Sequence, residues 1–413
     1  MKVAVVGSGI SGLSASHFLS KKYTVDLFEK DNHFGGHSFT VDIQENNPNQ
    51  LISLDLGFIV FNKATYPNLL KFFNDLKVDY EKSNMSFAVS VKNSNIEYSG
   101  SGLNGLFTNK LNIFNVNFLK MIKEIISFYK KAEQIKSTSF KDLTLGDFLK
   151  SRNFSNYFIN FHIIPMVAAI WSMPTSLAEK MPMNLFLNFF KNHGLFKIKN
   201  RPQWYTVTGR SKTYVKKVLQ TISGEYFKNY EIKGVERNKN NVRLYYGSLN
   251  EYFDYDKVVF ATHADDTLRL IKDPTENEKN ILRNFMYKKN IACLHSDSQL
   301  MPKKISAWSS WNSILDKNDQ SKNCVTYWLN KLQNLKTTNN YFLTLNPIFP
   351  IDDKKMIKEI KFSHPFYDLQ TLKSQKDLVK LQGRNNTWFC GSYFGYGFHE
   401  DGIKSALDIV NQI

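Results

Sequence analysis

Short apolar runs and amphipathic stretches alternate from the start of the chain. Residues 2–6 (KVAVV) predict a strand buried in a parallel sheet, and Thr24–Phe28 (TVDLF) predicts a second such strand. Between them, Ser11–Lys21 has the pattern of a helix. This order predicts a βαβ unit of about thirty residues.

Similar patterns continue along the chain, without an internal repeat or a low-complexity linker. A strand and a polar turn are expected at 41–61, ahead of the apolar run Leu51–Leu56, and a hairpin turn is expected at Asn238-Lys239-Asn240. The other expected elements are the strands Glu231–Arg237, Asn241–Tyr246, Lys257–Ala261, 291–295, 323–329, 341–346 and Thr387–Cys390, and the helices Tyr66–Leu76, Phe114–Ile135, Leu145–Phe190 and Gly402–Val410.

The first candidate site follows the first predicted strand, in the sequence Gly7-Ser-Gly9-Ile10-Ser11-Gly12. Gly7 permits a tight turn from strand to helix, Gly9 lets the backbone approach a pyrophosphate, and Gly12 lets the helix pack close to the strand. The free amides and the positive dipole end of the helix favour phosphate groups. The motif therefore predicts a nucleotide site.

A carboxylate and a second glycine pair extend this site. Glu29 ends the second strand, twenty residues after Gly9, where a carboxylate accepts hydrogen bonds from ribose hydroxyls and disfavours a 2′-phosphate. Lys30 and a short spacer then lead into Gly35-Gly36-His37. Here the chain resembles the FAD-binding flavin amine oxidase superfamily, whose members carry an acid, a spacer and Gly-Gly-Arg. The resemblance implies that these residues hold FAD, with His37 in place of an arginine that contacts the pyrophosphate and ribitol.

Other segments are similar to the same superfamily in the same order. Asp55-Leu-Gly57-Phe58-Ile59 resembles its segment beside the isoalloxazine, and Thr208-Gly209-Arg210-Ser211 resembles the loop before its adenine-contacting strand. The resemblance implies that the backbone of Ile232 meets the adenine. It also implies that Ala261 and Thr262, at the end of the strand before His263, line the nucleotide site.

The C-terminal segment predicts the flavin half of the site. A strand leads through Gly391 and Ser392 into a loop rich in glycine, and we expect the first free amides of the next helix at Gly402 and Ile403. A helix N-terminus near flavin N1 and C2=O favours the reduced flavin, because these atoms become electron-rich on reduction. The superfamily usually has an acid where this chain has Ser392, so one ribitol contact is altered.

The resemblance narrows to one branch, and it covers the whole chain, 1–413. This branch comprises predicted NAD/FAD-binding oxidoreductases named for their association with cyclopropane-fatty-acid synthases. The segments that carry the resemblance are Phe389–Gly402, Leu294–Pro302 with Trp308 and Trp311-Asn312, and Thr326–Gln333. The resemblance implies a fatty-acyl substrate, methylated or still attached to phospholipid, and non-covalent FAD.

Four residues near the expected flavin ring are candidate catalytic groups: His399, Glu400, Tyr396 and Tyr393. His399 and Glu400 are suited to remove an allylic proton while hydride passes to flavin N5. The alternative is that both residues cap the last helix and brace the loop, because the helix dipole alone favours an acid in the first turn. His263, His295 and Asp297 are expected in packing roles.

Composition and charge bear on partners and location. The 33 Phe and 20 Tyr predict either a Phe-rich core or a roomy apolar pocket, and both interpretations stay open. The formal net charge of +17 favours anionic partners or reflects a compositional drift towards Lys and Asn. No Arg-rich arm or basic tract with interleaved aromatics is present, so we expect no nucleic acid and favour an anionic lipid surface.

The cysteine pattern and the hydropathy suggest a reducing compartment. Cys293, Cys324 and Cys390 have no ligand spacing, so neither a metal site nor a disulfide framework is expected. The apolar run Val3–Val6 is too short for a signal peptide, and Tyr157–Met173 is too short and too polar to span a bilayer. We therefore expect a cytoplasmic protein, with peripheral association at the inner face of the membrane as a candidate.

Together these signals predict an α/β fold with a Rossmann-like FAD-binding domain of the amine oxidase type and an interleaved α+β substrate domain. The predicted FAD-binding domain comprises 1–65, 200–265 and 380–413, and the predicted substrate domain comprises 66–199 and 266–379. The leading functional hypothesis is FAD-dependent desaturation or double-bond isomerisation of an unsaturated acyl chain. The alternatives are a flavin amine or polyamine oxidase and a non-catalytic lipid or protein binder.

Overall fold

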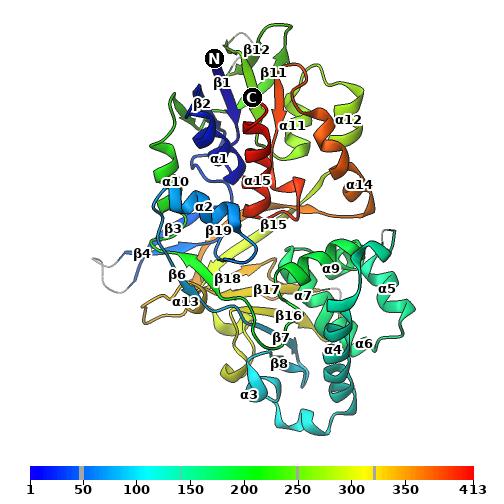
Figure 1. Cartoon of the computed structure of the whole chain (residues 1–413). Helices are drawn as coiled ribbons and strands as arrows, with labels where there is room; N and C mark the ends of the chain where they lie inside the picture. Colours follow the sequence, from blue (N-terminus) through cyan, green and yellow to red (C-terminus); the bar gives the residue numbers. More distant parts are fainter. Residues whose placement is uncertain (46–50, 141, 248–250, 320–321) are drawn as a thin grey trace.

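The computed structural model in Figure 1 describes residues 1–45, 51–140, 142–247, 251–319 and 322–413. Its two main parts are arranged along one long axis. A parallel sheet lies near the two termini, and a larger mixed sheet lies below it with a group of helices at its side.

The parallel sheet contains the predicted βαβ unit, which is confirmed. Its strands lie in the order β10 (Tyr226–Lys228), β2 (Thr24–Glu29), β1 (Lys2–Val6), β14 (Lys257–Phe260) and β20 (Thr387–Phe389). In β1, Val3 and Val5 point into one core while Ala4 and Val6 point into the core on the opposite face. Because both faces of this strand are covered, its sequence is apolar without alternation.

Helices cover one face of this sheet and a small antiparallel sheet covers the other. The helices are α1 (Ile10–Leu19), α2 (Pro67–Asp75), α10 (Lys212–Leu219) and α15 (His399–Val410). The small sheet consists of β11 (Ile232–Arg237), β12 (Val242–Tyr246) and β13 (Glu251–Tyr255). It packs with α11 (Ala264–Leu270), α12 (Glu276–Leu282) and η7 (Leu378–Leu381), and α14 (Leu369–Asp377) packs against α12. The predicted hairpin is confirmed, and in its turn the amide of Asn238 donates to the carbonyl of Asn241.

The second sheet has seven strands, of which three were predicted. Their order is β19 (Met356–Phe366), β15 (Met286–His295), β18 (Phe342–Leu345), β17 (Asn323–Trp328), β16 (Trp311–Asp316), β7 (Phe87–Lys92) and β8 (Glu97–Ser99). The long antiparallel pair β15 and β19 connects the two parts of the molecule in Figure 1. The strand β19 was not predicted because its exposed positions carry Lys358, Lys361 and Glu359 on a sheet edge.

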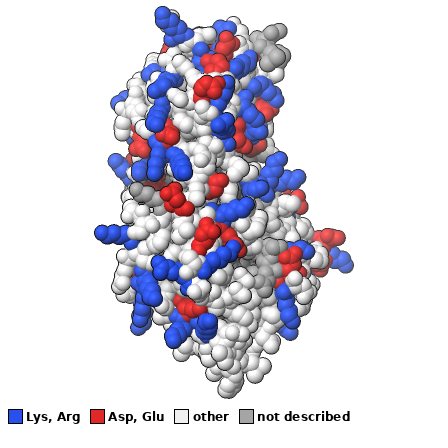
Figure 2. All heavy atoms as spheres, turned by 90° about the vertical axis from the view of Figure 1, so that its right-hand side faces the viewer, with Lys and Arg blue, Asp and Glu red and all other residues white. Residues whose placement is uncertain are grey.

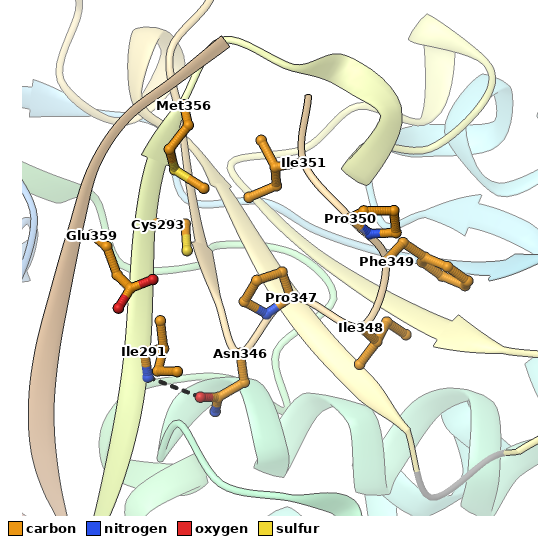
Figure 3. Close-up of a pocket in the computed structure, with 10 residues that line it drawn as sticks. All are labelled: Ile291, Cys293, Asn346, Pro347, Ile348, Phe349, Pro350, Ile351, Met356 and Glu359. Atoms are coloured by element: carbon orange, nitrogen blue, oxygen red, sulfur yellow. Dashed lines mark hydrogen bonds between the residues drawn. The ribbon is translucent and has the colours of Figure 1, made fainter. Parts of the chain in front are cut away.

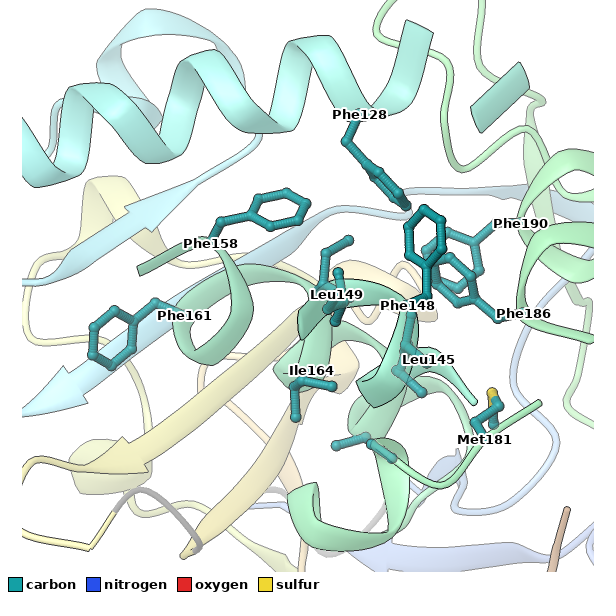
Figure 4. Packing of buried hydrophobic residues seen from close by; sticks show 14 of the residues in the cluster. Phe128, Leu145, Phe148, Leu149, Phe158, Phe161, Ile164, Met181, Phe186 and Phe190 are labelled. Carbon is teal, nitrogen blue, oxygen red and sulfur yellow. The ribbon is translucent and has the colours of Figure 1, made fainter. Parts of the chain in front are cut away.

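A group of helices packs beside this sheet around a core rich in phenylalanine (Figure 4). The helices are α4 (Val116–Gln134), α5 (Leu145–Ser151), α6 (Asn156–Phe158), α7 (Ile164–Ile170), α8 (Thr175–Ala178) and α9 (Met183–Asn192). The helical character of Leu145–Phe190 is confirmed, but the segment is not one helix. Pro174 and Pro182 begin new helices, because proline cannot continue a helix from within. The Phe-rich core accounts for many of the aromatic residues.

Smaller elements complete the fold. They are β3 (Thr40–Gln44) paired with β4 (Leu51–Asp55), the sheet β5 (Phe61–Asn62), β9 (Trp204–Val207) and β6 (Tyr80–Ser83), and the short helices α3 (Gly102–Leu106), η1 (Lys110–Phe114), η5 (Ile305–Ala307), α13 (Leu329–Leu332) and η8 (Ser392–Phe394). The polar turn expected before Leu51 lies mostly outside the described residues. The predicted domain division stays a prediction, although α2 packs directly against α15. Of the helices in the described ranges, none combines the length and apolar character needed to cross a bilayer.

Candidate functional site

The first glycine loop leaves room for a ligand at one position. Gly7 has φ +99°, and a Cβ there would lie 2.9 Å from the carbonyl oxygen of Ala261. A Cβ on Gly12 would lie 1.8 Å from the carbonyl oxygen of Gly7, so this glycine is needed for the helix to pack on the loop. A Cβ on Gly9 would meet nothing within 4 Å. Gly9 is therefore the point where an external group can approach the backbone.

The second glycine pair and the last helix converge on the same point. Gly35 and Gly36 have φ +118° and +55°, in the region that favours glycine, and a Cβ on Gly36 would lie 3.1 Å from Cα of Gly9. A Cβ on Gly402 would lie 2.7 Å from Oγ of Ser11, so α15 passes very close to the first turn of α1. The second glycine pair and α15 thus both lie against the N-terminus of α1, where amides favour an anion.

Glu29 faces the first glycine loop from the end of β2. Its Oε2 accepts hydrogen bonds from the amide and the hydroxyl of Ser8, at 3.0 and 2.5 Å, and its Oε1 accepts from the amide of Asp31 at 3.0 Å. The buried carboxylate is therefore held at the position where a ribose is expected. The next residue, Lys30, forms an ion pair with Asp266 at 3.6 Å.

His37 lies inside the site with an unpaired ring nitrogen. Its Nε2 is buried and has no hydrogen-bond partner, while its ring stacks on Phe362 with centroids 5.0 Å apart. Burial, followed by the neighbouring His364 and His263, lowers the pKa of His37 well below its ordinary value. A neutral imidazole with a free nitrogen can donate or accept one hydrogen bond, so it suits a polar cofactor atom.

Gly57 and Asp55 hold the surrounding backbone in place. A Cβ on Gly57 would lie 2.0 Å from the carbonyl oxygen of His37, and the same carbonyl accepts from the amide of Phe58 at 2.7 Å. Asp55 is fully buried and accepts from the amide and hydroxyl of Ser211 at 2.8 and 2.6 Å. Burial raises the pKa of Asp55 to about 6, although these hydrogen bonds act to lower it. Sequence reasoning missed this link, which ties the start of α10 to β4.

The other predicted nucleotide-site residues lie at strand ends or in cores. Ala261 donates its amide to the carbonyl of Val6 at 2.8 Å, directly after β14. Thr262 shares a hydroxyl contact of 2.7 Å with Thr267, and Ile232 is buried at the start of β11. Ile59 belongs to the core of the seven-stranded sheet, whereas its neighbour Phe58 belongs to the core below the parallel sheet.

The last helix begins earlier than expected, which corrects one prediction. α15 starts at His399, and the amide of Gly402 already donates to the carbonyl of Phe398 at 3.1 Å. Gly402 and Ile403 therefore do not supply the first free amides, which belong to His399, Glu400 and Asp401 instead. Asp401 caps the N-terminus of α15, because its carboxylate accepts a hydrogen bond from the amide of Phe398 at 3.0 Å.

The strand-to-loop turn at Gly391 is tightly built. The amide of Gly391 donates to the hydroxyl of Ser405 at 2.9 Å, and a Cβ on Gly391 would lie 2.2 Å from the ring of Tyr393. The carbonyl of Ser392 accepts from the amides of Gly395 and Gly397, both at 3.1 Å. This glycine-rich loop is therefore an ordered turn that leads into α15.

The four candidate catalytic residues have separate surroundings. Nε2 of His399 lies 3.0 Å from the hydroxyl of Ser38 and 3.1 Å from that of Tyr214, and burial lowers its pKa to about 3. Glu400 accepts from the amides of Asn68 and Leu69, both at 3.0 Å, and so caps the first turn of α2. These contacts are those of packing and capping groups.

The two tyrosines lie in different cores. Tyr393 is buried, its hydroxyl has no partner, and its ring packs on Phe285 with centroids 5.1 Å apart. Tyr396 is half-buried and belongs to the core of the helical part, where its carbonyl accepts from Nε1 of Trp171 at 3.1 Å. Burial raises the pKa of both hydroxyls. Of the four candidates, Tyr396 alone packs against the Phe-rich core formed by α4 to α9.

The remaining polar candidates have structural partners. His295 Nε2 lies 2.8 Å from the hydroxyl of Thr344, and Asp297 accepts from the amides of Gln299 and Asp352. Ligand atoms of His263, Asp265 and Asp266 lie within 4.8 Å of one another, but Lys30 and Arg269 already pair with Asp266. His263 itself stacks on Tyr287, with centroids 4.1 Å apart.

A surface hollow of about 510 Å³ lies away from these residues (Figure 3). It is formed by β15, the segment 346–351 and the start of β19, and the side chain of Asn346 accepts from the amide of Ile291 at its edge. None of the glycine-loop residues lines it. This hollow is therefore separate from the candidate nucleotide site.

Comparison with known proteins agrees with this geometry. Residues 5–76 match the family described as NAD(P)-binding Rossmann-like domain. The chain is similar along its whole length to a CLA-producing fatty acid isomerase from P. acnes, with 13% identity, a TM-score of 0.69 and coverage of 100% of this chain and 98% of the other. The chain has the FAD amine oxidase fold.

Two amine oxidases have the same fold. Putrescine oxidase bound to putrescine is 12% identical, with a TM-score of 0.70 and coverage of 100% and 99%. Cyclohexylamine oxidase from Brevibacterium oxydans is 13% identical, with a TM-score of 0.66 and the same coverage. A search of curated protein sequences finds no match. The predicted fold class is confirmed, and at these identities the likeness establishes the fold alone.

Proposed function

We propose that this protein is a FAD-dependent oxidoreductase that desaturates an unsaturated fatty-acyl chain, methylated or not, or shifts its double bond. The adenosine ribose would lie at Glu29, and the pyrophosphate would lie between Gly9, Gly36 and the first turn of α1. The imidazole of His37 has a ring nitrogen free for the cofactor. When bound, FAD supplies the hydride acceptor.

The proposed FAD is non-covalent. Cys293, Cys324 and Cys390 are all buried, and burial raises the pKa of each thiol above its ordinary value, so none is a ready thiolate. His399, the imidazole in the C-terminal segment, is held by Ser38 and Tyr214. Acid denaturation should therefore release free FAD into the supernatant.

One observation carries the choice of substrate class. Phe398 packs on Phe189 with centroids 4.9 Å apart and lies 6.3 Å from Trp171, so the loop before α15 meets aromatic side chains of the helical part. The two carboxylates that follow, Glu400 and Asp401, are directed at backbone amides. Aromatic faces alone can also attract a cation, but the two carboxylates next to them are already engaged by backbone amides, so an apolar acyl chain is favoured over an amine.

Within this proposal, Tyr396 is the group best placed to contact the substrate. Its ring contacts Phe189 with centroids 5.6 Å apart, its carbonyl accepts from Nε1 of Trp171, and its raised pKa keeps its hydroxyl protonated at neutral pH. A protonated phenol can donate a hydrogen bond or a proton but is a poor base. His399, Glu400 and Tyr393 would then position the loop and the helix around it.

A second candidate function is oxidation of a small amine or polyamine. A hollow of about 380 Å³ lies beside the same loop, and Asp401 and Asp408 line it together with Tyr396. Carboxylates of this kind would favour a cationic substrate. Lys404 lines the same hollow, which weakens that attraction. A third candidate, from another class, is a lipid or protein binder that retains the fold without catalysis.

Anaerobic reduction of the bound flavin distinguishes these functions. The purified holoenzyme is mixed without oxygen with an unsaturated fatty acid, its phospholipid ester, putrescine or spermine, and flavin absorbance and double-bond position are followed. We expect bleaching or a shifted double bond with the acyl compounds only. Reduction by either amine would replace the acyl assignment, and no change with any compound would favour the binder.

A further inference from the structure

One end of the molecule carries a group of apolar side chains in solvent. Leu103, Leu111, Phe114, Val116 and Ile305 are 75, 67, 84, 76 and 75% exposed. They belong to α3, η1, the start of α4 and η5, and we call these five residues the apolar tip. Scattered exposed apolar residues are ordinary, but a contiguous group marks an interaction surface.

The tip is an ordered structure. The side-chain amides of Asn109 and Asn112 donate to the carbonyl of Asn95, and Asn115 caps α4 by accepting from the amide of Phe118 at 3.1 Å. Nζ of Lys304 donates to the carbonyl of Thr108 at 2.9 Å, which ties η5 to this region. The apolar side chains are thus held outward by a fixed backbone.

The exposed charged side chains around the tip are mainly basic. From Ser99 to Leu119 the sequence contains no acidic residue and a single basic one, Lys110. Lys120, Lys123 and Lys303 lie on the adjoining segments and are exposed. The nearest acids in sequence are occupied, since Glu97 accepts from the amides of Lys303 and Lys304, and Glu124 accepts from Ser155.

Figure 2 shows the same arrangement in space. The lower end of the molecule, where α3 and the start of α4 lie in Figure 1, carries no charged side chain on the face in view, and Lys and Arg side chains, with fewer Asp and Glu side chains among them, begin just above it. An apolar end with a basic rim is the pattern of a protein that rests on an anionic bilayer, with apolar groups below the headgroups and lysines among them.

We propose that the apolar tip docks the protein on an anionic lipid surface. Its apolar side chains enter the interface, and Lys110, Lys120, Lys123 and Lys303 contact the acidic headgroups. The charge decides against a second copy of the chain as the occupant, because a symmetric contact would bring two basic rims together. The proposal extends the acyl-lipid function but does not depend on it, since it concerns binding without turnover.

Vesicle binding tests the surface with matched variants. The full-length holoenzyme is sedimented with vesicles of phosphatidylcholine alone or of phosphatidylcholine mixed with phosphatidylglycerol, at low and high salt. We expect binding to the mixed vesicles only, weakened by salt. Leu111→Ser combined with Phe114→Ser should weaken it about tenfold or more, because two apolar side chains leave the interface. Val379→Ser, which also removes a 67% exposed side chain but far along the sequence in η7, should bind as the wild type does.

A site-specific fluorescent label reports directly whether the apolar tip enters the lipid. The three native cysteines are buried, so Phe114→Cys can be labelled selectively with an environment-sensitive fluorophore, with Val379→Cys as the control. We expect a blue shift at position 114 on adding mixed vesicles and none at position 379. Circular dichroism and thermal melting confirm that the variants fold, as expected for exposed positions.

The opposite results overturn the proposal. Unchanged vesicle binding by the Leu111→Ser, Phe114→Ser variant, or equal fluorescence shifts at both labelled positions, would place the lipid contact elsewhere. Self-association of the wild type that the same variant abolishes would assign the tip to a second copy. Absence of binding to any vesicle would reject lipid docking, while flavin reduction by a soluble fatty acid would still stand and keep the proposed function separate.

Discussion

The imidazole of His399 stacks on the ring of Phe58, with centroids 3.7 Å apart and planes 13° apart. Nε2 of the same imidazole lies between the hydroxyls of Ser38 and Tyr214. His399 therefore joins the first turn of α15 to segments more than a hundred residues away, as a neutral group in a packed core. Its buried position explains the low pKa of about 3.

The first prediction concerns acid stability. The pKa of His399 is about 3 in the folded protein and about 6.5 in the unfolded chain, so the unfolded chain binds more protons between these values. The contribution of the neutral His399 to the free energy of unfolding is complete above pH 6.5. It is lost as the pH falls towards 3, at up to about 1.4 kcal/mol per pH unit. We expect the free energy of unfolding, measured in urea, to fall less steeply in His399→Gln than in the wild type.

The same variant tests the catalytic alternative. If His399 acts only in packing, His399→Gln should leave turnover of the remaining holoenzyme within a few-fold of wild type. An acid–base role predicts a loss of about 10²-fold or more with unchanged FAD content. If the free energy of unfolding changed with pH by the same amount in the wild type and in His399→Gln, His399 would not be a buried neutral imidazole in the folded protein.

The second prediction contrasts two glycines of one loop. A Cβ on Gly9 meets nothing, so Gly9→Ala should fold with nearly wild-type thermal stability but bind FAD weakly, because the methyl group occupies the approach of the pyrophosphate. A Cβ on Gly12 would overlap the carbonyl of Gly7, so Gly12→Ala should lose about 1–3 kcal/mol of stability or fail to fold. Calorimetric melting and titration with FAD measure both effects. Full FAD affinity in Gly9→Ala would move the pyrophosphate away from this loop.

The third prediction concerns Glu29. Glu29→Ala should weaken FAD binding by about 1–3 kcal/mol, since hydrogen bonds to a charged acceptor are lost. Asp31→Ala removes a neighbouring exposed carboxylate and should leave the affinity unchanged. Titration of the apoprotein with FAD compares the two. Equal losses in both variants would indicate a general effect of charge and contradict a ribose contact at Glu29.

The fourth prediction concerns Glu400. Because this carboxylate accepts from two amides in the first turn of α2, Glu400→Ala should reduce the free energy of unfolding by about 1–3 kcal/mol. The rate of flavin reduction per bound FAD should stay near wild type. Glu276→Ala is the control, because Glu276 lies exposed in a helical first turn and pairs with Lys279. A large kinetic loss without loss of stability would restore Glu400 as a catalytic group.

Local constraints made much of the nucleotide site predictable. Only glycine fits at Gly7 and Gly12, and β1 is apolar throughout because both of its faces are covered. The turn, the strand and Glu29 lie within one βαβ unit of the sequence, so a single stretch of residues contains nearly all of the information. The sequence by itself therefore determined the fold class and the glycine motif.

The tertiary structure alone decided what depends on contacts between distant segments. Glu400 meets Asn68 across 332 positions and Asp55 meets Ser211 across 156, so no local pattern could reveal that these carboxylates cap helices. The exposure of Phe114 could not be predicted either, since the pattern of apolar residues along the chain does not show whether another segment covers a given side chain. Burial is a property of the assembled chain, and residue type alone gives only its average.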